Sequence, residues 1–140
     1  MPAGFQLNVI TQARILMSGE VHSVTAPGSE GYLGIWANHA PLATALQPGK
    51  LTIKDSRGSE AVYAVTGGFL EVSRNVVTLL ADAMEPPAEI DVERAEAAAE
   101  RARKRLAERG PDIDLTRAEA ALARALVRLK VAREAVRRAG

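Results

Sequence analysis

The chain changes in composition between Glu85 and Ala95, and this change limits its fold more than any other feature. Every aromatic residue lies before this change: Phe5, Tyr32, Trp36, Tyr63 and Phe69. Most of the glycines lie before it as well. After it the sequence consists mainly of Ala, Arg, Glu and Leu. Pro86 and Pro87 stand at the change, and proline cannot continue a helix from upstream. We therefore predict two domains, residues 1–86 and residues 87–140.

The first domain has the pattern of short strands. Apolar and polar residues alternate, or apolar residues run together, in 5–10, 15–24 (interrupted at Gly19), 31–36, 51–53, 61–65, 69–72 and 76–81. Turn signals such as Pro27-Gly28 and Pro48-Gly49 separate these segments. Many short strands with frequent turns are typical of an antiparallel β-sandwich or barrel. The segments 51–53 and 61–65 are expected to form a hairpin.

The second domain is predicted to contain two helices. Asp91 is a good N-cap for the first, which should run to about Glu108 or Arg109. Gly110 is expected to supply a left-handed residue at its end. Asp112 or Asp114 should cap a second helix that runs nearly to the C-terminus. The short connection predicts an antiparallel two-helix hairpin, and the chain as a whole is α+β, with β followed by α.

The facing surfaces of these helices are rich in alanine. The expected stripes are Ala95, Ala98, Ala99, Ala102 and Leu106 in the first helix, and Leu115, Ala118, Leu122, Ala125, Leu126, Leu129 and Val136 in the second. Each alanine methyl group removes little apolar area from water. Because burial contributes roughly 25 cal/mol per Å², such an interface is weak compared with a leucine-rich one. We predict a hairpin of modest cohesion that can dock, undock or extend.

Composition excludes several classes of function. The chain has no cysteine, so disulfides and thiol chemistry are absent. Neither half has the charge of a polyanion-binding surface, and no aromatic residue accompanies the arginines of the second half, so we expect no nucleic-acid partner. No segment approaches the roughly 18 to 20 apolar residues of a membrane span, and the N-terminus lacks the pattern of a signal peptide.

No catalytic constellation is evident. His22 and His39 lie far apart, and neither accompanies a carboxylate pair, a nucleophile motif or a metal-spaced cluster. We interpret both as structural, with the imidazole of His39 bonding the backbone of its loop. An independent enzyme with a sandwich fold would need such a constellation. No metal or catalytic cofactor is expected.

Most arginines of the second domain have an acid three or four residues away on the same helix, but Arg101, Arg124 and Arg128 do not. Arg124 and Arg128 are also one turn apart, and such like charges are mildly destabilising in an isolated helix. These arginines can be solvated, meet an acid of a partner protein, or bind a phosphate group. The spacing alone favours one of the first two.

Taken together, the two halves resemble the epsilon subunit of bacterial F-type ATP synthase over essentially the whole chain. The motifs that carry the resemblance are Gly28-Ser29-Glu30-Gly31-Tyr32-Leu33-Gly34-Ile35, Asn38-His39-Ala40-Pro41-Leu42, Gln47-Pro48-Gly49, Gly67-Gly68-Phe69-Leu70-Glu71-Val72 and Val77-Thr78-Leu79-Leu80-Ala81-Asp82. The resemblance implies a ten-stranded antiparallel β-sandwich followed by the helical hairpin. It also implies a non-catalytic, regulatory role in a rotary complex.

Such a subunit belongs to the central stalk, where it binds the gamma subunit and the ring of c subunits. The resemblance places these contacts in the region 30–42, at Glu30, Tyr32, Asn38 and His39, with Tyr32 and His39 the first to test. The helices of many such subunits extend toward the alpha and beta subunits and block ATP hydrolysis. The implied location is the cytoplasmic face of the bacterial cell membrane, as a peripheral part of the complex.

Some members of the family bind ATP on the folded hairpin as a regulatory ligand. Their motif Ile/Leu-Asp-x-x-Arg-Ala is matched by residues 90–95. The resemblance assigns the phosphates to Arg94, Arg101, Arg124 and Arg128, and the adenosine portion to Glu85, Ile90, Asp91 and Ala95.

An internal repeat bears on this assignment. Residues 112–121 nearly repeat residues 89–98, and both satisfy Ile-Asp-x-x-Arg-Ala. The motif therefore also describes an ordinary capped helix start, and the arginines of the second helix carry more of the argument. Two alternatives remain: the same rotor subunit without nucleotide binding, and a stand-alone β-sandwich adaptor with a coiled-coil hairpin.

Overall fold

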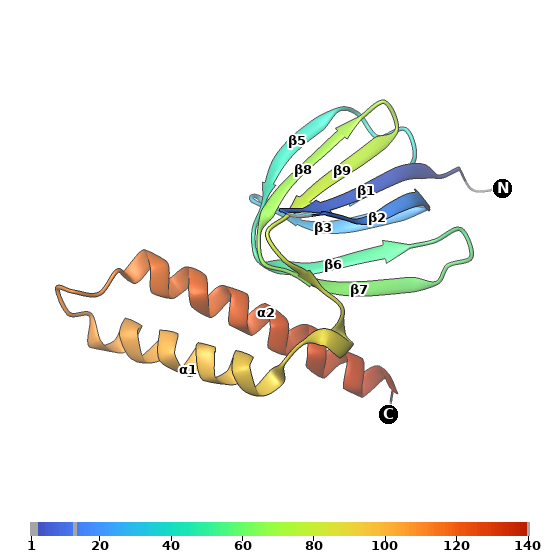
Figure 1. Ribbon diagram of the computed structural model, residues 1–140. Coiled ribbons are helices and arrows are strands. Elements are labelled where there is room, and N and C mark those ends of the chain that lie inside the picture. Colours follow the sequence, from blue (N-terminus) through green and yellow to red (C-terminus); the bar gives the residue numbers. More distant parts are fainter. Residues whose placement is uncertain (1–2, 13, 140) are drawn as a thin grey trace. The chain divides into compact units, whose positions relative to one another are not determined.

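The computed structural model describes residues 3–12 and 14–139. The chain forms two compact units, Met1–Met84 and Glu85–Gly140, which we call the β unit and the helical unit (Figure 1). Each unit has its own buried cluster of side chains.

The β unit is built from ten strands. They are β1 (Phe5–Thr11), β2 (Arg14–Val21), β3 (Ser23–Gly28), β4 (Gly31–Ile35), β5 (Leu42–Leu46), β6 (Gly49–Lys54), β7 (Glu60–Val65), β8 (Gly68–Ser73), β9 (Val76–Ala81) and β10 (Met84–Glu85). Their order across the sheet is β10-β7-β6-β3-β5-β8-β9-β1-β2, and β4 pairs with β3. The predicted ten-stranded sandwich is confirmed.

Among the described residues, strands β1 to β9 pair antiparallel with one exception. Strands β1 and β9 are parallel, with Leu7 opposite Val77 and Val9 opposite Leu79. A parallel pair requires a long crossover, and strands β2 to β8 provide it. The predicted hairpin of β6 and β7 is present, with Leu51 opposite Tyr63.

Alternation along the strands builds the core. Every second residue of β1 is buried (Phe5, Leu7 and Val9), and the intervening residues are half-buried. The same alternation places Leu70 and Leu79, both 0% exposed, in one cluster. A shift of one residue in any strand would turn these side chains to the other face, so burial of this cluster fixes the register.

The strands differ from the sequence prediction in three places. Strand β5 was not predicted, because its outward residues Ala43 and Ala45 hide the alternation. The segment 15–24 forms two strands, β2 and β3, rather than one. Pro27 and Gly28 belong to β3, and the turn lies at 29–30, so the turn prediction at Pro27-Gly28 was wrong by two residues.

The helical unit begins with a single 3-10 turn, η1 (Pro87–Glu89), and continues into α1 (Val92–Glu108) and α2 (Leu115–Ala139), which run antiparallel in Figure 1. The carboxylate of Asp91 accepts a hydrogen bond from the backbone N–H of Arg94 at 3.1 Å, and that of Asp114 accepts one from Arg117 at 3.1 Å. Both are N-caps, so the predicted cap at Asp91 is confirmed and Asp114 caps α2.

The end of α1 differs from the prediction. Arg109, with φ of 46°, is the left-handed residue, and its N–H donates to the carbonyl of Arg105 at 3.2 Å. Gly110 does not adopt this conformation. The helix ends at Glu108, so the left-handed position falls on Arg109, which accepts it at a cost of about 1–2 kcal/mol.

The interface between the helices is formed mainly by alanine. Its buried cluster contains Ala95, Ala99, Ala125 and Leu129, with Ala98 and Leu122 packed against it. The predicted stripe on α2 was wrong at three positions that are exposed: Leu115, Leu126 and Val136. Ala118 and Ala125 are buried as predicted.

Candidate functional site

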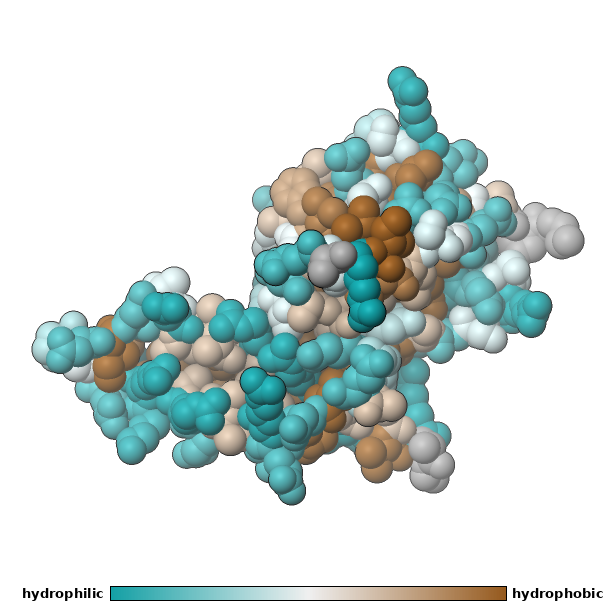
Figure 2. All heavy atoms as spheres, in the orientation of Figure 1, coloured by the Kyte–Doolittle hydropathy of each residue, from teal (hydrophilic) through white to brown (hydrophobic). Residues whose placement is uncertain are grey.

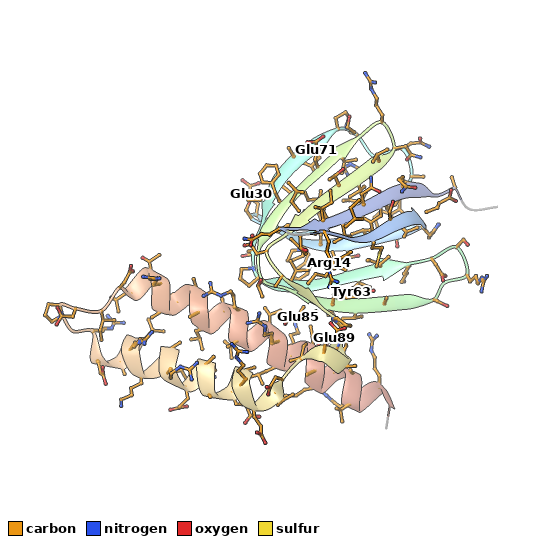
Figure 3. All side chains as sticks on the ribbon, viewed as in Figure 1. Arg14, Glu30, Tyr63, Glu71, Glu85 and Glu89 are labelled. Atoms are coloured by element: carbon orange, nitrogen blue, oxygen red, sulfur yellow. The ribbon has the colours of Figure 1, made fainter. Side chains whose placement is uncertain are left out.

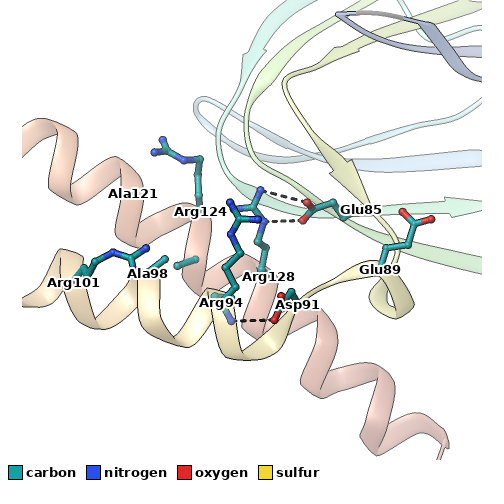
Figure 4. Close-up of a pocket in the computed structure, with 11 residues that line it drawn as sticks. Glu85, Glu89, Asp91, Arg94, Ala98, Arg101, Ala121, Arg124 and Arg128 are labelled. Atoms are coloured by element: carbon teal, nitrogen blue, oxygen red, sulfur yellow. Dashed lines mark hydrogen bonds and ion pairs between the residues drawn. The ribbon is translucent and has the colours of Figure 1, made fainter.

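A cavity of about 400 Å³ opens between the two helices of the helical unit. Its wall contains Arg94 and Arg101 from α1 and Arg124 and Arg128 from α2, as Figure 4 shows. The other lining residues are three acids and four alanines: Glu85, Glu89, Asp91, Ala95, Ala98, Ala121 and Ala125. Ligand pockets in proteins enclose roughly 300–1,000 Å³, so this volume is sufficient for a small molecule.

The structure brings together almost all residues that the resemblance assigns to ATP. Every one of them lines the cavity except Ile90, which is half-buried and lies outside the lining. Helical periodicity explains the grouping, because residues three, four or seven apart share one face of a helix. Arg94, Ala98 and Arg101 follow this spacing on α1, as Ala121, Arg124 and Arg128 do on α2.

The alanines create the space. Ala98, Ala121 and Ala125 lie between the arginines, and their short side chains leave room for another group. Longer apolar residues at these positions would fill the gap between the helices. The cavity is therefore a consequence of the same alanine-rich interface that limits the cohesion of the hairpin.

Arg128 has an acidic partner within the unit. Its Nε lies 2.7 Å from Oε1 of Glu85, and its Nη2 lies 3.4 Å from Oε2 of the same carboxylate. Figure 3 labels Glu85 and Glu89 in the segment that leads into α1. The pairing holds the guanidinium of Arg128 in a fixed orientation at the edge of the cavity. From the sequence we expected solvent or an acid of a partner protein for this arginine; its acidic partner is instead Glu85 of the chain itself.

The other three arginines differ from Arg128. Among the residues that the structure describes, no carboxylate lies within ion-pair distance of the guanidinium of Arg94, Arg101 or Arg124. Asp91, although it lines the cavity, uses its carboxylate to cap α1. Arginine remains protonated in proteins and carries five N–H donors. These three side chains therefore offer positive charge and hydrogen-bond donors to an anion.

The β unit holds the residues assigned to partner contacts. Glu30 is exposed at the turn between β3 and β4, and Figure 3 labels it. The ring of Tyr32 is 55% exposed, while its hydroxyl accepts a hydrogen bond from the backbone N–H of Lys50 at 2.9 Å. This bond fixes the orientation of an otherwise solvent-exposed ring.

Asn38 and His39 shape the loop before β5. Asn38 has φ of 62°, and its N–H donates to the side-chain oxygen of Asn75 at 2.6 Å. Nδ1 of His39 lies 2.8 Å from the carbonyl oxygen of Ala40. The expectation that this imidazole bonds the backbone is confirmed. The loop is thereby preorganised, which reduces the entropy lost when it binds a partner.

Sequence reasoning missed a further surface on the β unit. Outward apolar residues of five neighbouring strands lie opposite one another and form one row. In order across the sheet, the row contains Ala45, Phe69, Leu80, Ile10 and Ile15. We call these five residues the outer apolar row. Phe69, Leu80 and Ile15 are 44%, 48% and 65% exposed. Figure 2 shows apolar side chains gathered on one side of this unit. Contiguous exposed apolar surface is typical of a contact site.

Within 3–12 and 14–139, no group of three or more His, Asp or Glu side chains has the arrangement of a metal site. None of the described helices is long and apolar enough to cross a membrane.

Comparison with known proteins identifies the family. Residues 4–87 match the family described as ATP synthase, Delta/Epsilon chain, beta-sandwich domain. Residues 88–133 match the family described as ATP synthase, Delta/Epsilon chain, long alpha-helix domain. This chain belongs to the ATP synthase epsilon-chain family. The ATP synthase epsilon chain of Moorella thermoacetica is 50% identical over 130 residues, which cover 93% of this chain and 97% of that protein. That of Pelotomaculum thermopropionicum is 54% identical over 127 residues, covering 91% and 94%.

Solved structures agree with this assignment. A chain of the Euglena gracilis mitochondrial ATP synthase (OSCP/F1/c-ring) matches with a TM-score of 0.81 and 26% identity, over 97% of this chain and 83% of that one. A chain of the Tetrahymena thermophila mitochondrial ATP synthase (central stalk/c-ring) shares the fold, with a TM-score of 0.63 and 16% identity over 93% and 94%. As an epsilon chain, the protein is a non-catalytic subunit of ATP synthase.

Four cavity residues of this epsilon chain were not predicted from the sequence: Glu89, Ala98, Ala121 and Ala125. Helical spacing from Arg94, Arg124 and Arg128 would have found the alanines. The outer apolar row depends on pairing between distant strands, and no local pattern reveals it.

Proposed function

We propose that this epsilon chain is a regulatory subunit of the ATP synthase rotor. The β unit would bind the gamma subunit and the c-ring. The helical unit would bind ATP when folded, and when extended would reach the alpha and beta subunits and inhibit ATP hydrolysis. The chain would lie peripherally at the cytoplasmic face of the bacterial cell membrane. The observation that carries the regulatory part is the cavity with two arginines from each helix.

The chemistry of the cavity favours a phosphate chain. Arg94, Arg101 and Arg124 have no carboxylate partner among the described residues, and each can donate two parallel hydrogen bonds to phosphate oxygens. A triphosphate carries enough negative charge to engage all three. A ligand without several anionic oxygens would leave some of these hydrogen-bond donors without an acceptor.

The alanine surface suits the remainder of a nucleotide. Ala95, Ala98 and Ala125 present small apolar groups beside the arginines. Glu85, Ile90 and Asp91 remain the predicted contacts of the adenosine portion, together with Ala95. The carboxylate of Glu85 has a second role, because its pairing with Arg128 aligns a donor at the rim.

Ligand binding at this cavity would regulate the hairpin. A ligand shifts a conformational equilibrium only by the difference between its affinities for the two states. The arginines of α1 and α2 form a complete phosphate site only while the two helices are together. ATP would therefore stabilise the folded hairpin and oppose its extension.

The rotor part of the proposal is supported by the outer apolar row. Its exposed Phe69 and Leu80 are suited to burial against an apolar surface of the gamma subunit. The preorganised Tyr32 and His39, with Glu30 and Asn38, would complete the contacts to gamma and the c-ring. The related chains of the Euglena and Tetrahymena enzymes belong to assemblies that include the c-ring.

Calorimetry of the full chain with ATP tests the regulatory part. We expect Arg94→Ala and Arg124→Ala each to weaken binding by about tenfold to a hundredfold, the effect of losing a charged hydrogen bond. Arg103→Ala is the matched control, because this exposed arginine of α1 does not line the cavity. Absence of binding heat, or equal affinities for all three variants, would contradict ATP binding at this cavity. The alternative of a rotor subunit without nucleotide binding would then be favoured.

Association with purified gamma subunit tests the rotor part. Leu80→Glu places a charge in the middle of the outer apolar row and is expected to weaken association by at least tenfold. Arg57→Glu, at an exposed turn outside the row, is the control. If the first variant binds gamma as well as the wild type does, this face is not the gamma contact. If the wild type binds neither gamma nor the c-ring, the adaptor alternative is favoured.

A further inference from the structure

We propose that the hairpin contains a second phosphate-binding site, at the end where α1 and α2 are joined. Another cavity of about 570 Å³ lies there, lined by Arg105, Arg117 and Arg124 together with Asp112 and Asp114, and it shares Ala121 and Arg124 with the first cavity. Nothing in the function proposed above uses this cavity.

The internal repeat of the sequence relates the two cavities. Asp91, Arg94 and Ala95 of the first recur as Asp114, Arg117 and Ala118 of the second, at one constant offset along the chain. The same offset relates other lining residues: Glu89 to Asp112, Ala98 to Ala121, and Arg101 to Arg124. In the opposite direction it takes Arg128 to Arg105. The α2 wall of the second cavity therefore repeats the α1 wall of the first, and Arg105 is the α1 lining residue that matches Arg128.

The local geometry repeats as well. Each motif starts a helix with an aspartate that accepts a hydrogen bond from an arginine N–H, at 3.1 Å in both cases. Ala95 and Ala118, one position further, are 4% and 3% exposed. Because antiparallel helices are related by an approximate two-fold axis, the start of one helix meets the later part of the other at both ends. The two ends of the hairpin therefore share a buried alanine and an arginine in addition to the N-cap.

The arginines of the second cavity offer hydrogen-bond donors to the oxygens of a phosphate chain, beside the two acids Asp112 and Asp114. Among the described residues, no carboxylate lies within ion-pair distance of the guanidinium of Arg105, Arg117 or Arg124. The carboxylate of Asp114 caps α2, as that of Asp91 caps α1. In the first cavity, Arg128 gives hydrogen-bond donors to the carboxylate of Glu85. The matching arginine of the second cavity, Arg105, has no such carboxylate partner among the described residues. Its donors therefore remain available to a ligand.

Arg124 lines both cavities, and this has a consequence for binding. One guanidinium cannot give its full set of donors to two phosphate chains. Occupation of one cavity is therefore expected to weaken binding at the other. The ligand class is a phosphate chain, supplied either by a nucleoside triphosphate or by inorganic triphosphate.

The test uses the full chain, with ATP and with inorganic triphosphate as separate ligands, followed by calorimetry and by backbone amide NMR. Arg117→Ala and Arg94→Ala are matched variants, since the repeat makes each the counterpart of the other. With at least one ligand, we expect the wild type to show two binding events. Arg117→Ala should weaken the event that shifts amides 112–118 by about tenfold or more, and Arg94→Ala the event that shifts amides 91–98. Arg124→Ala should weaken both.

The two ligands distinguish the source of the phosphates. Shifts at 112–118 with ATP indicate a nucleotide site, and shifts with inorganic triphosphate alone indicate a site for the phosphate chain. If circular dichroism shows that Arg117→Ala disturbs the helices, Arg105→Gln takes its place. The proposal is overturned if neither ligand shifts amides 112–118, or if Arg117→Ala and Arg105→Gln bind as the wild type does. Failure of the first site appears separately, as an unchanged titration of Arg94→Ala.

Discussion

The β unit and the helical unit bury different kinds of side chain. The β unit encloses Leu7, Leu51, Leu70 and Leu79, all 0% exposed, within a large cluster of branched and aromatic residues. The cluster of the helical unit contains three alanines and Leu129. Burial of a large apolar side chain contributes about 1.5–3 kcal/mol, and a methyl group contributes far less. The β unit can hold a fixed shape by itself, whereas the helical unit has the weaker core that the proposed response to ATP requires.

The largest effect is expected in the core of the β unit. Leu70→Ala leaves a cavity among tightly packed strands and should lower the free energy of unfolding by about 3 kcal/mol. Urea denaturation followed by the fluorescence of Trp36, the only tryptophan, reports on this unit. Leu80→Ala, at a site 48% exposed, is the control and should have a much smaller effect. Equal losses for both variants would mean that the strands do not depend on this core.

The second effect concerns ATP and the helical unit. At a concentration one hundred times its Kd, a ligand that binds only the folded form stabilises it by about 2.7 kcal/mol. Without ATP, amide hydrogen exchange should be faster in α1 and α2 than in β8 and β9. With ATP, exchange in the helices should slow by up to about a hundredfold, and exchange in the strands should not change. Helices already as protected as the strands would remove the contrast between the units.

The two units also differ in how far the sequence predicts them. Alternation along β1 and β8 is a local signal, and those strands were predicted to within a residue or two. Strand β5 was missed because Ala43 and Ala45 occupy the exposed positions that polar residues usually fill. The parallel pair of β1 and β9 brings together segments from opposite ends of the unit, and only the completed sheet determines it.

In the helical unit, periodicity predicted the helices but not their exact faces. Leu126 and Val136 have the spacing of core residues and are exposed, because α1 covers only part of α2. The arginines of the cavity were identified through the family resemblance and through their missing helical partners. The Glu85–Arg128 pair was not predicted, since it joins residues from separate segments.

A third test enlarges a side chain in the helix interface. Ala99 is 1% exposed, and Ala99→Leu forces the helices apart at a cost of about 2 kcal/mol. Circular dichroism at the helical minimum should show unfolding at lower urea, while the Trp36 transition stays in place. Ala97→Leu, at an exposed position of the same helix, is the control and should be neutral. An unchanged helical transition in Ala99→Leu would show that the interface is looser than its burial indicates.

The smallest effect is expected at the Glu85–Arg128 pair. Both side chains are about 30% exposed, at 30% and 31%, so solvent screens their attraction, and Glu85→Gln should lower the stability of the helical unit by less than about 1 kcal/mol. Glu96→Gln is the matched control: Glu96 pairs with Arg133 at 3.4 Å, but these side chains are 55% and 60% exposed. Glu96→Gln should have no measurable effect, because well-hydrated pairs contribute little.

The stabilities of both variants are compared by helical circular dichroism in urea at low and high salt. The loss in Glu85→Gln should shrink as salt rises, because screening already weakens the wild-type pair. A loss of several kcal/mol would instead mean that this one pair, rather than the alanine interface, holds the helical unit together.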